Sequence, residues 1–191
     1  VFVGGGDETV YALDAATGRK VWATKAGGKV LGSPAVVENR VYIGVTGGRI
    51  LCLDAAKGRI VWEFATGGDD GASPAVSDGR VFVENAPDAI LCLDAATGKK
   101  IWECPMAGKV HGSPLSVLGK RLYGAKGDEA AVFCLEAETG KEVWRCEAGR
   151  ACASPAISGE RLFVDADLEE DGIITGGALA HMDARTGARV W

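Results

Sequence analysis

The stretch that decides the fold is Ala12–Trp22, which reads ALDAATGRKVW. This phrase runs from a small residue through Leu-Asp-Ala-x-Thr-Gly to a tryptophan. It recurs with few changes at Cys52–Trp62, Cys92–Trp102, Cys134–Trp144 and His181–Trp191. The five phrases contain all five tryptophans of the chain, in steps of 40, 40, 42 and 47 residues. A repeat of about 40 to 45 residues is typical of a β-propeller, in which each repeat forms one blade.

Between successive tryptophans, the sequence predicts four β-strands. In the second repeat these are Val30–Val37, Arg40–Val45, Arg49–Asp54 and Arg59–Ala65, all rich in strand-forming residues and separated by turn signals. The Asp-Ala-x-Thr-Gly turn suits the last hairpin, because Asp accepts hydrogen bonds from nearby amides and Gly adopts a positive φ cheaply. We therefore predict an all-β propeller of four-stranded antiparallel blades. Its expected units are a partial blade at 1–28 and blades near 29–68, 69–108, 109–149 and 150–191.

The residues that recur in every phrase have a structural explanation in this fold. A blade leaves apolar faces that only its neighbours can cover, and a tryptophan offers a large apolar surface for that seam. Its single N–H can donate to a backbone carbonyl of the next blade. The predicted blade-docking residues are Trp22, Trp62, Trp102, Trp144 and Trp191, with the turn residues Asp14, Asp54, Asp94, Gly18, Gly58, Gly98, Gly140 and Gly187.

The phrase resembles the tryptophan-docking motif of the pyrroloquinoline-quinone-like (PQQ-like) β-propeller repeat family, and the resemblance covers essentially the whole chain. It implies a ring of seven or eight blades, of which about five are present, so we expect sequence outside this chain to supply the rest. The family includes quinone-dependent alcohol and sugar dehydrogenases, the lipoprotein of the outer-membrane barrel-assembly machinery, and sensor or scaffold domains. It also implies a periplasmic or other extracytoplasmic location. A shared fold does not choose among these functions.

Composition excludes several partners. The net charge of −5 and pI near 5.1 argue against nucleic acid, since phosphate binding requires clustered Lys and Arg. No apolar run approaches the roughly 18 residues of a membrane span. Cys52, Cys92 and Cys134 occupy equivalent positions in different repeats, too far apart for disulfides, and are predicted to be small buried side chains. A Cys146–Cys152 pair stays open, because the two are close in sequence.

Few residues outside the phrase suggest ligand binding. His111 begins a first strand, and first strands line the central channel of a propeller. Glu84, Asn85 and Asp88 lie in the connection between the second and third strands of their repeat, where loops vary and carry specificity. These four are the candidate ligand-face residues. The acidic stretch Asp165–Ala178 is interpreted as a solvated loop, because it lacks the glycine and glutamate of a calcium-binding EF-hand.

The resemblance also implies what a quinone enzyme would need. Its dehydrogenases use a catalytic aspartate, calcium ligands that include Glu and Asn, a tryptophan stacked on the quinone and often two adjacent cysteines. Here all five tryptophans belong to docking phrases and no Cys-Cys pair occurs. We therefore predict no catalytic, cofactor or metal residues, and a non-catalytic scaffold that binds a protein partner or peptide strand through its loop face. The alternatives are the scaffold portion of a PQQ- and calcium-dependent dehydrogenase, or a ligand-sensing domain of a larger protein.

Overall fold

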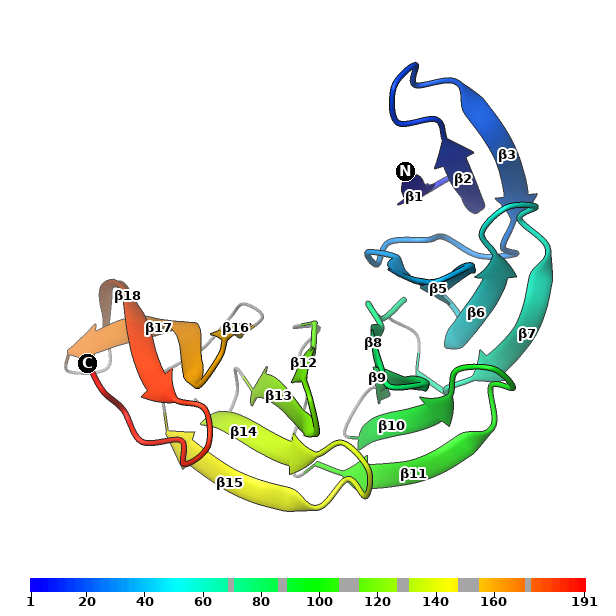
Figure 1. Ribbon diagram of the computed structural model, residues 1–191. Helices are drawn as coiled ribbons and strands as arrows, with labels where there is room; N and C mark the ends of the chain where they lie inside the picture. The colour runs from blue at the N-terminus through cyan, green and yellow to red at the C-terminus, as the bar shows by residue number, and fades with distance from the viewer. Residues whose placement is uncertain (69–70, 86–88, 107–113, 127–130, 148–154, 171–172) are drawn as a thin grey trace.

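The computed structural model describes residues 1–68, 71–85, 89–106, 114–126, 131–147, 155–170 and 173–191. Every regular element in these ranges is a β-strand. The strands form five antiparallel sheets, which follow one another along an open arc in chain order (Figure 1). Within each complete sheet, the first strand lies nearest the centre of the arc and the last on its outer rim (Figure 1).

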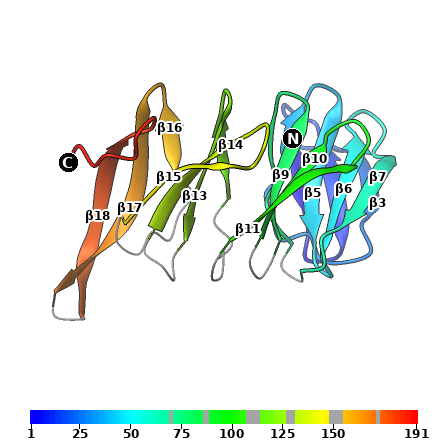
Figure 2. The same cartoon turned by 90° about the horizontal axis from the view of Figure 1, so that it is seen from below.

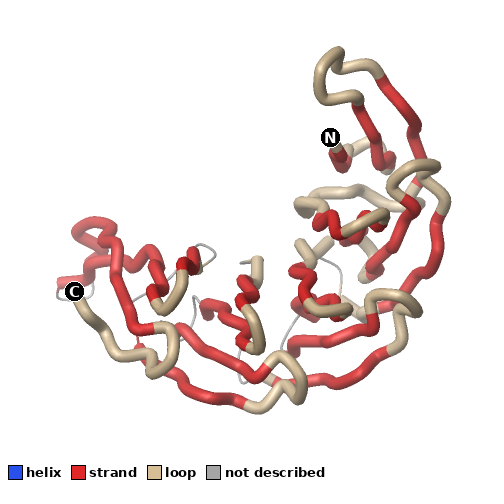
Figure 3. The backbone as a smooth tube through the Cα atoms, viewed as in Figure 1, coloured by secondary structure: helices blue, strands red, loops and turns tan. Residues whose placement is uncertain are grey.

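The sheets have the following strands. The first contains β1 (Phe2–Gly4), β2 (Thr9–Leu13) and β3 (Lys20–Lys25), and the second contains β4 (Ala35–Val37), β5 (Arg40–Val45), β6 (Arg49–Asp54) and β7 (Ile60–Ala65). The third contains β8 (Ala75–Ser77), β9 (Arg80–Asn85), β10 (Ala89–Asp94) and β11 (Lys100–Pro105). The fourth contains β12 (Ser116–Leu118), β13 (Arg121–Lys126), β14 (Ala131–Glu136) and β15 (Glu142–Glu147), and the fifth contains β16 (Ala156–Ser158), β17 (Arg161–Glu170) and β18 (Ile173–Asp183). Where the chain between two strands is described, it forms a loop or turn (Figure 3).

The second blade matches the expected strands except at its start. Strands β5 and β6 have the predicted bounds and β7 begins one residue late, but β4 is much shorter than Val30–Val37. Pro34 has no N–H to offer a ladder. The amide of Val30 instead donates to the carbonyl of Gly5 in the first blade, at 3.1 Å. The segment before Pro34 therefore connects two blades instead of extending a strand.

The prediction of a loop at Asp165–Ala178 was wrong. This stretch belongs to the long hairpin of β17 and β18, whose register continues to Glu170 opposite Ile173. Figure 2 shows this hairpin extending past the edge of the other blades. The run Ile173-Ile174-Thr175 favours extended backbone, because branched side chains fit a pleated sheet. Acidic residues are uncommon in strands, so the charge of this stretch favoured the prediction of a loop.

The two terminal sheets have three strands each. The first blade begins at β1, which is equivalent to the second strand of a complete blade. In the last blade, where a fourth strand was expected, residues 188–191 make a single bridge between Met182 and Arg189. Trp191, the last docking tryptophan, is 58% exposed. A tryptophan therefore docks onto a following blade at four seams.

The apolar core consists of four clusters, one at each seam between successive sheets. The cluster between the second and third blades joins Tyr42, Ile50 and Trp62 to Val83 and Leu91. Each fourth strand is displaced by a bulge at the same place, which sets its tryptophan opposite the small residue that opens the phrase. Thus Trp62 lies across from Cys52 and contacts the following blade.

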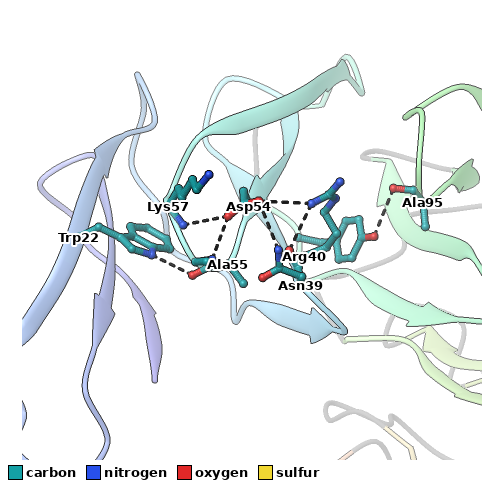
Figure 4. A network of polar contacts seen from close by, with 9 residues as sticks. Trp22, Asn39, Arg40, Asp54, Ala55, Lys57 and Ala95 are labelled. Atoms are coloured by element: carbon teal, nitrogen blue, oxygen red, sulfur yellow. Dashed lines mark hydrogen bonds and ion pairs between the residues drawn. The ribbon is translucent and has the colours of Figure 1, made fainter.

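Four tryptophans bind the next blade through one repeated contact. The indole Nε1 of each donates to the carbonyl of the residue after the turn acid: Trp22 to Ala55 (2.9 Å), Trp62 to Ala95 (2.9 Å), Trp102 to Ala137 (3.1 Å) and Trp144 to Ala184 (3.1 Å). Figure 4 shows the first of these contacts together with the turn around Asp54. Asp54 Oδ1 accepts the amide of Lys57 at 2.9 Å, so the turn presents its carbonyl to the tryptophan.

The turn glycine of each phrase is required for two reasons. Gly98 has a φ of +71°, and a Cβ added there would lie 2.7 Å from two ring atoms of Trp62. Gly58, Gly140 and Gly187 face Trp22, Trp102 and Trp144 in the same way. Glycine thus permits both the left-handed turn and the close approach of the indole from the preceding blade.

Gly98→Ala is expected to destabilise the protein by about 2–4 kcal/mol, because the added methyl meets Trp62 in a packed seam and the backbone keeps its positive φ. Gly79→Ala is the matched control: its φ is +70°, but nothing lies within 4 Å of the added Cβ. Urea unfolding of both variants separates the two effects. Equal losses of stability in both would show that the indole contact contributes nothing to the requirement for glycine.

Candidate functional site

The described residues form a cavity of about 210 Å³ where the second and third blades meet. It lies at the face that carries the loop between β5 and β6 and the segment after β7, which are joined by a bond from the Thr66 amide to the Gly48 carbonyl (2.7 Å). The lining residues are Leu31, Gly32, Val45, Gly48, Arg49, Ile50, Thr66, Gly68, Gly71, Ala72, Ser73, Glu84 and Pro114. Segments of three repeats therefore contribute to one cavity.

Glu84 is the acidic side chain among the described lining residues. Strand β9 carries it opposite Ile90, and its Oε1 is buried with no hydrogen-bond partner in the described part of the chain. Burial raises the pKa of Glu84 to about 8. A carboxyl group in this environment is mostly protonated at neutral pH, because ionisation would place an uncompensated charge in an apolar site.

The neighbouring blades carry no acid at the equivalent position. The fifth residue of the second strand is Gly44 in the second blade and Ala125 in the fourth. At Gly44 the carbonyl oxygen of Ala72 lies 2.0 Å from where a Cβ would be, so the backbone of the following segment occupies that space. The fifth blade does carry an acid at this position, Asp165, but that residue is exposed. A buried carboxyl group at this position is therefore found, among the described blades, in the third.

Arg49 is the charged neighbour of Glu84 in the cavity wall, but its guanidinium is held elsewhere. Its Nη1 lies 3.1 Å from Glu63 Oε1, and its Nη2 donates to the Ala26 carbonyl at 2.9 Å. Ser73 is also engaged, since its Oγ accepts the Ser33 amide at 2.9 Å. These contacts fix the wall, while the buried oxygen of Glu84 is directed at no described group.

The structure places the four candidate ligand-face residues unequally. Glu84 lies in the cavity, as described above. The backbone of Asn85 ends β9 opposite Ala89, and its side chain lies outside the described part of the structure. His111 and Asp88 also lie outside the described residues. Sequence reasoning missed the cavity residues of the second repeat, because only the docking of two blades brings Arg49 and Thr66 near β9.

A quinone–calcium site would require several oxygen ligands and a tryptophan that is free to stack on the quinone. Among the described residues, no three side chains of His, Cys, Asp and Glu lie together as a metal-binding set. Calcium takes six to eight oxygen ligands, and the described cavity offers a single carboxyl group. Four tryptophans are held in blade seams by their Nε1 atoms. The described residues therefore do not fit that cofactor pair.

The opposite face has two larger clefts that repeat from one seam to the next. One cleft, of about 550 Å³, is lined by the turn at Glu38–Arg40 and by Asp94–Ala96. The other, of about 310 Å³, is lined by the equivalent residues of the following blades, including Arg80 and Glu138. Because both follow from the spacing of the hairpins, they mark the scaffold and not a specialised site.

The described cysteines are free thiols with inert surroundings. Cys52, Cys92 and Cys134 are fully buried, and burial raises their thiol pKa values to about 11, 12 and 11. Cys104 and Cys146 are partly buried, with pKa values also raised by burial. The predicted possibility of a Cys146–Cys152 pair involves Cys152, which lies outside the described residues.

Thiol reagents are expected to modify the folded protein slowly, because the thiolate is the reactive form and burial suppresses it. In a Cys152→Ser background, Ellman's reagent at neutral pH should leave Cys52, Cys92 and Cys134 unmodified until denaturant is added. Mass spectrometry of peptides identifies any modified site. Fast modification of one of these three thiols in the folded protein would contradict their burial, whereas slow reaction at Cys104 or Cys146 would not.

None of the described segments is a helix long and apolar enough to cross a membrane.

Known proteins share this fold. The family model described as outer membrane protein assembly factor BamB matches residues 1–72, 46–129 and 89–191. No curated protein sequence matches the chain. The crystal structure of BamB from Moraxella catarrhalis covers all of this chain with a TM-score of 0.77 and 20% identity, and the chain covers 59% of that structure. The chain therefore spans less than two thirds of that protein.

Two other structures show the breadth of the fold. The computationally designed Ika8 protein covers the whole chain with a TM-score of 0.80 and 18% identity, and 57% of it is covered in return. The quinohemoprotein alcohol dehydrogenase from Comamonas testosteroni covers 86% of the chain with a TM-score of 0.68 and 18% identity, and 34% of it is covered. These likenesses concern the fold. The family match spans the whole chain, and with the repeated tryptophan docking it shows that this chain belongs to the BamB family of PQQ-like β-propellers.

Proposed function

We propose that this chain is part of a non-catalytic scaffold that binds a protein partner in outer-membrane protein assembly, outside the cytoplasm. The observation that carries the proposal is the match of the BamB family model along the whole chain. The use of the repeated tryptophans and turn acids for blade docking supports it, because those residues are then committed to the scaffold.

The loop face that carries the Glu84 cavity is the proposed binding surface. Leu31, in the cavity wall, is 68% exposed, so an apolar side chain is available to a partner beside the cavity. The acidic net charge of −5 favours a partner with basic groups, since complementary charge steers association. Either a folded domain or an extended peptide strand could present such groups.

The proposal is tested by titrating the full-length protein with purified soluble domains of outer-membrane assembly proteins from the same organism, using calorimetry. We expect saturable binding with a Kd in the range of about 1–100 μM, typical of transient scaffold contacts. The same protein is titrated with pyrroloquinoline quinone, with and without calcium, while quinone absorbance and thermal unfolding are followed. We expect no shift in either signal.

The alternatives predict different results in the same titrations. The fold likeness to quinohemoprotein alcohol dehydrogenase supports the second candidate, a dehydrogenase scaffold completed by other blades. That candidate requires calcium-dependent quinone binding by the full-length protein. A sensing domain requires stabilisation by a small molecule without a protein partner. Either result, in the absence of binding to assembly proteins, would overturn the proposed scaffold function.

A further inference from the structure

We propose that the Glu84 cavity receives a primary ammonium group on an aliphatic chain, the chemistry of a lysine side chain, with the Glu84 carboxylate as its counter-ion. That the lysine belongs to a protein partner rests on the proposed function above. The binding chemistry itself rests on the cavity alone.

The size and wall of the cavity suit a single long side chain. Its volume of about 210 Å³ is below the range of roughly 300–1,000 Å³ that is usual for drug-sized ligands and cofactors. Leu31 and Pro114 contribute exposed apolar side chains to its wall, and the lining residues Val45 and Ile50 are almost completely buried. A lysine places methylene groups along such a surface while its ammonium reaches a polar group. The cavity offers apolar wall and one acid in that combination.

The buried oxygen of Glu84 explains why the ligand should be a cation. Oε1 is shielded from solvent and has no hydrogen-bond partner among the described residues, which is a costly state for a carboxyl group. An ammonium next to the carboxyl group supplies donors and a positive charge, so it stabilises the ionised form of Glu84. Arg49 does not already do this, because Glu63 and the Ala26 carbonyl hold its guanidinium.

A single carboxyl group favours ammonium over the other biological cations. A guanidinium presents five donors in a planar fork, and a single carboxyl group can accept only part of them. Divalent calcium requires six to eight oxygens, and among the described residues no acidic cluster provides them. An ammonium has three donors, and it binds as a compact point charge.

Binding should be coupled to proton release. Burial raises the pKa of Glu84 to about 8, so the empty cavity holds a neutral carboxyl group at lower pH. An arriving ammonium favours the carboxylate and displaces that proton. The affinity should therefore rise about tenfold per pH unit below pH 8 and level off above it. Arg49, the other charged side chain in the described wall, stays charged throughout this range.

The test uses Nα-acetyl-lysine methylamide as the probe and the norleucine analogue, which lacks the ammonium, as its matched control. Calorimetry with the full-length protein, at about pH 6.5 and about pH 7.5, should show saturable binding that tightens about tenfold with pH. Buffers of different ionisation enthalpy count the released protons. Glu84→Gln should weaken binding at least about tenfold, a loss typical of a charged contact. Glu103→Gln, an exposed acid paired with Lys100, should leave it unchanged.

Three results would overturn the proposal: no saturable binding of the lysine probe, equal binding of the norleucine analogue, or equal binding by Glu84→Gln. Because no partner protein is present, these outcomes are independent of the proposed scaffold function. Acetylating the lysines of a bound assembly domain then identifies the source of the ammonium. Weakened binding to the wild-type protein but not to Glu84→Gln supports a partner lysine, and unchanged binding to both overturns that source.

Discussion

Replacing Trp62 by alanine is expected to lower the free energy of unfolding by about 3–5 kcal/mol, the range for emptying a large buried aromatic site. Trp62 is the most buried of the docking tryptophans, with 9% of its surface exposed. Its ring packs beside that of Tyr42, with 5.9 Å between the ring centroids, and it lies against Gly98. Its Nε1 donates a hydrogen bond to the carbonyl of Ala95. Alanine leaves a cavity in the seam and removes the indole donor. The second and third blades therefore lose both the apolar surface and the hydrogen bond that Trp62 contributes to their seam.

Trp62→Phe separates the two contributions, because phenylalanine keeps much of the apolar surface and removes the donor. We expect it to cost about 1–2 kcal/mol from the lost indole hydrogen bond and the smaller ring. The Ala95 carbonyl keeps a second donor, the Tyr42 hydroxyl at 3.2 Å, which limits the loss. Urea unfolding measures both variants. If Trp62→Ala unfolded at the same midpoint as the parent protein, the seam would not depend on the docking phrase.

Glu84 is expected to make the protein less stable as pH rises from about 4.5 to about 8. Its pKa is 4.5 in the reference state and about 8 in the fold, so the folded protein binds more protons in this window. The stability contributed by the neutral carboxyl is complete below pH 4.5 and is lost as pH rises through 8. A difference of this size corresponds to on the order of 5 kcal/mol. Urea unfolding at several pH values measures the slope.

Glu84→Gln is the decisive variant for this dependence, because glutamine is neutral at every pH. It should remove most of the slope between pH 4.5 and pH 8 and be more stable than the parent protein above pH 8. Glu103→Gln, on the outer strand β11, should keep the parent slope, since that carboxylate is exposed beside Lys100. A slope that persists in Glu84→Gln would assign the pH dependence to other groups.

The repeated phrase made the blades predictable because its parts are local and each has one structural use. The Asp-to-Gly turn, the strand bounds of Arg40–Val45 and the family follow from residues that are near one another in sequence. The repeats share one further feature that predicts a contact. An aromatic residue stands about 20 positions before most of the tryptophans. In the structure Phe2, Tyr42, Phe82 and Tyr123 each pack beside the tryptophan of their own blade.

The candidate site was less predictable because it depends on contacts between blades. Glu84 could be named from its variable position, but no local pattern indicates that its carboxyl group is buried. That burial requires the backbone near Ala72 and the wall around Arg49, which belong to other segments. The late start of β4 depends likewise on Val30 bonding to the preceding blade. Such distances across seams have no counterpart in a local pattern.

The most direct test of the scaffold function is binding of purified outer-membrane assembly domains to two surface variants of the full-length protein. Leu31→Asp changes the loop face beside the Glu84 cavity, and Val21→Asp changes the outer strand β3; the two side chains are 68% and 62% exposed. Calorimetry should show binding that is weakened about tenfold or more by Leu31→Asp and retained by Val21→Asp. Failure of the parent protein to bind any such domain, or equal binding by both variants, would contradict a partner site on the loop face.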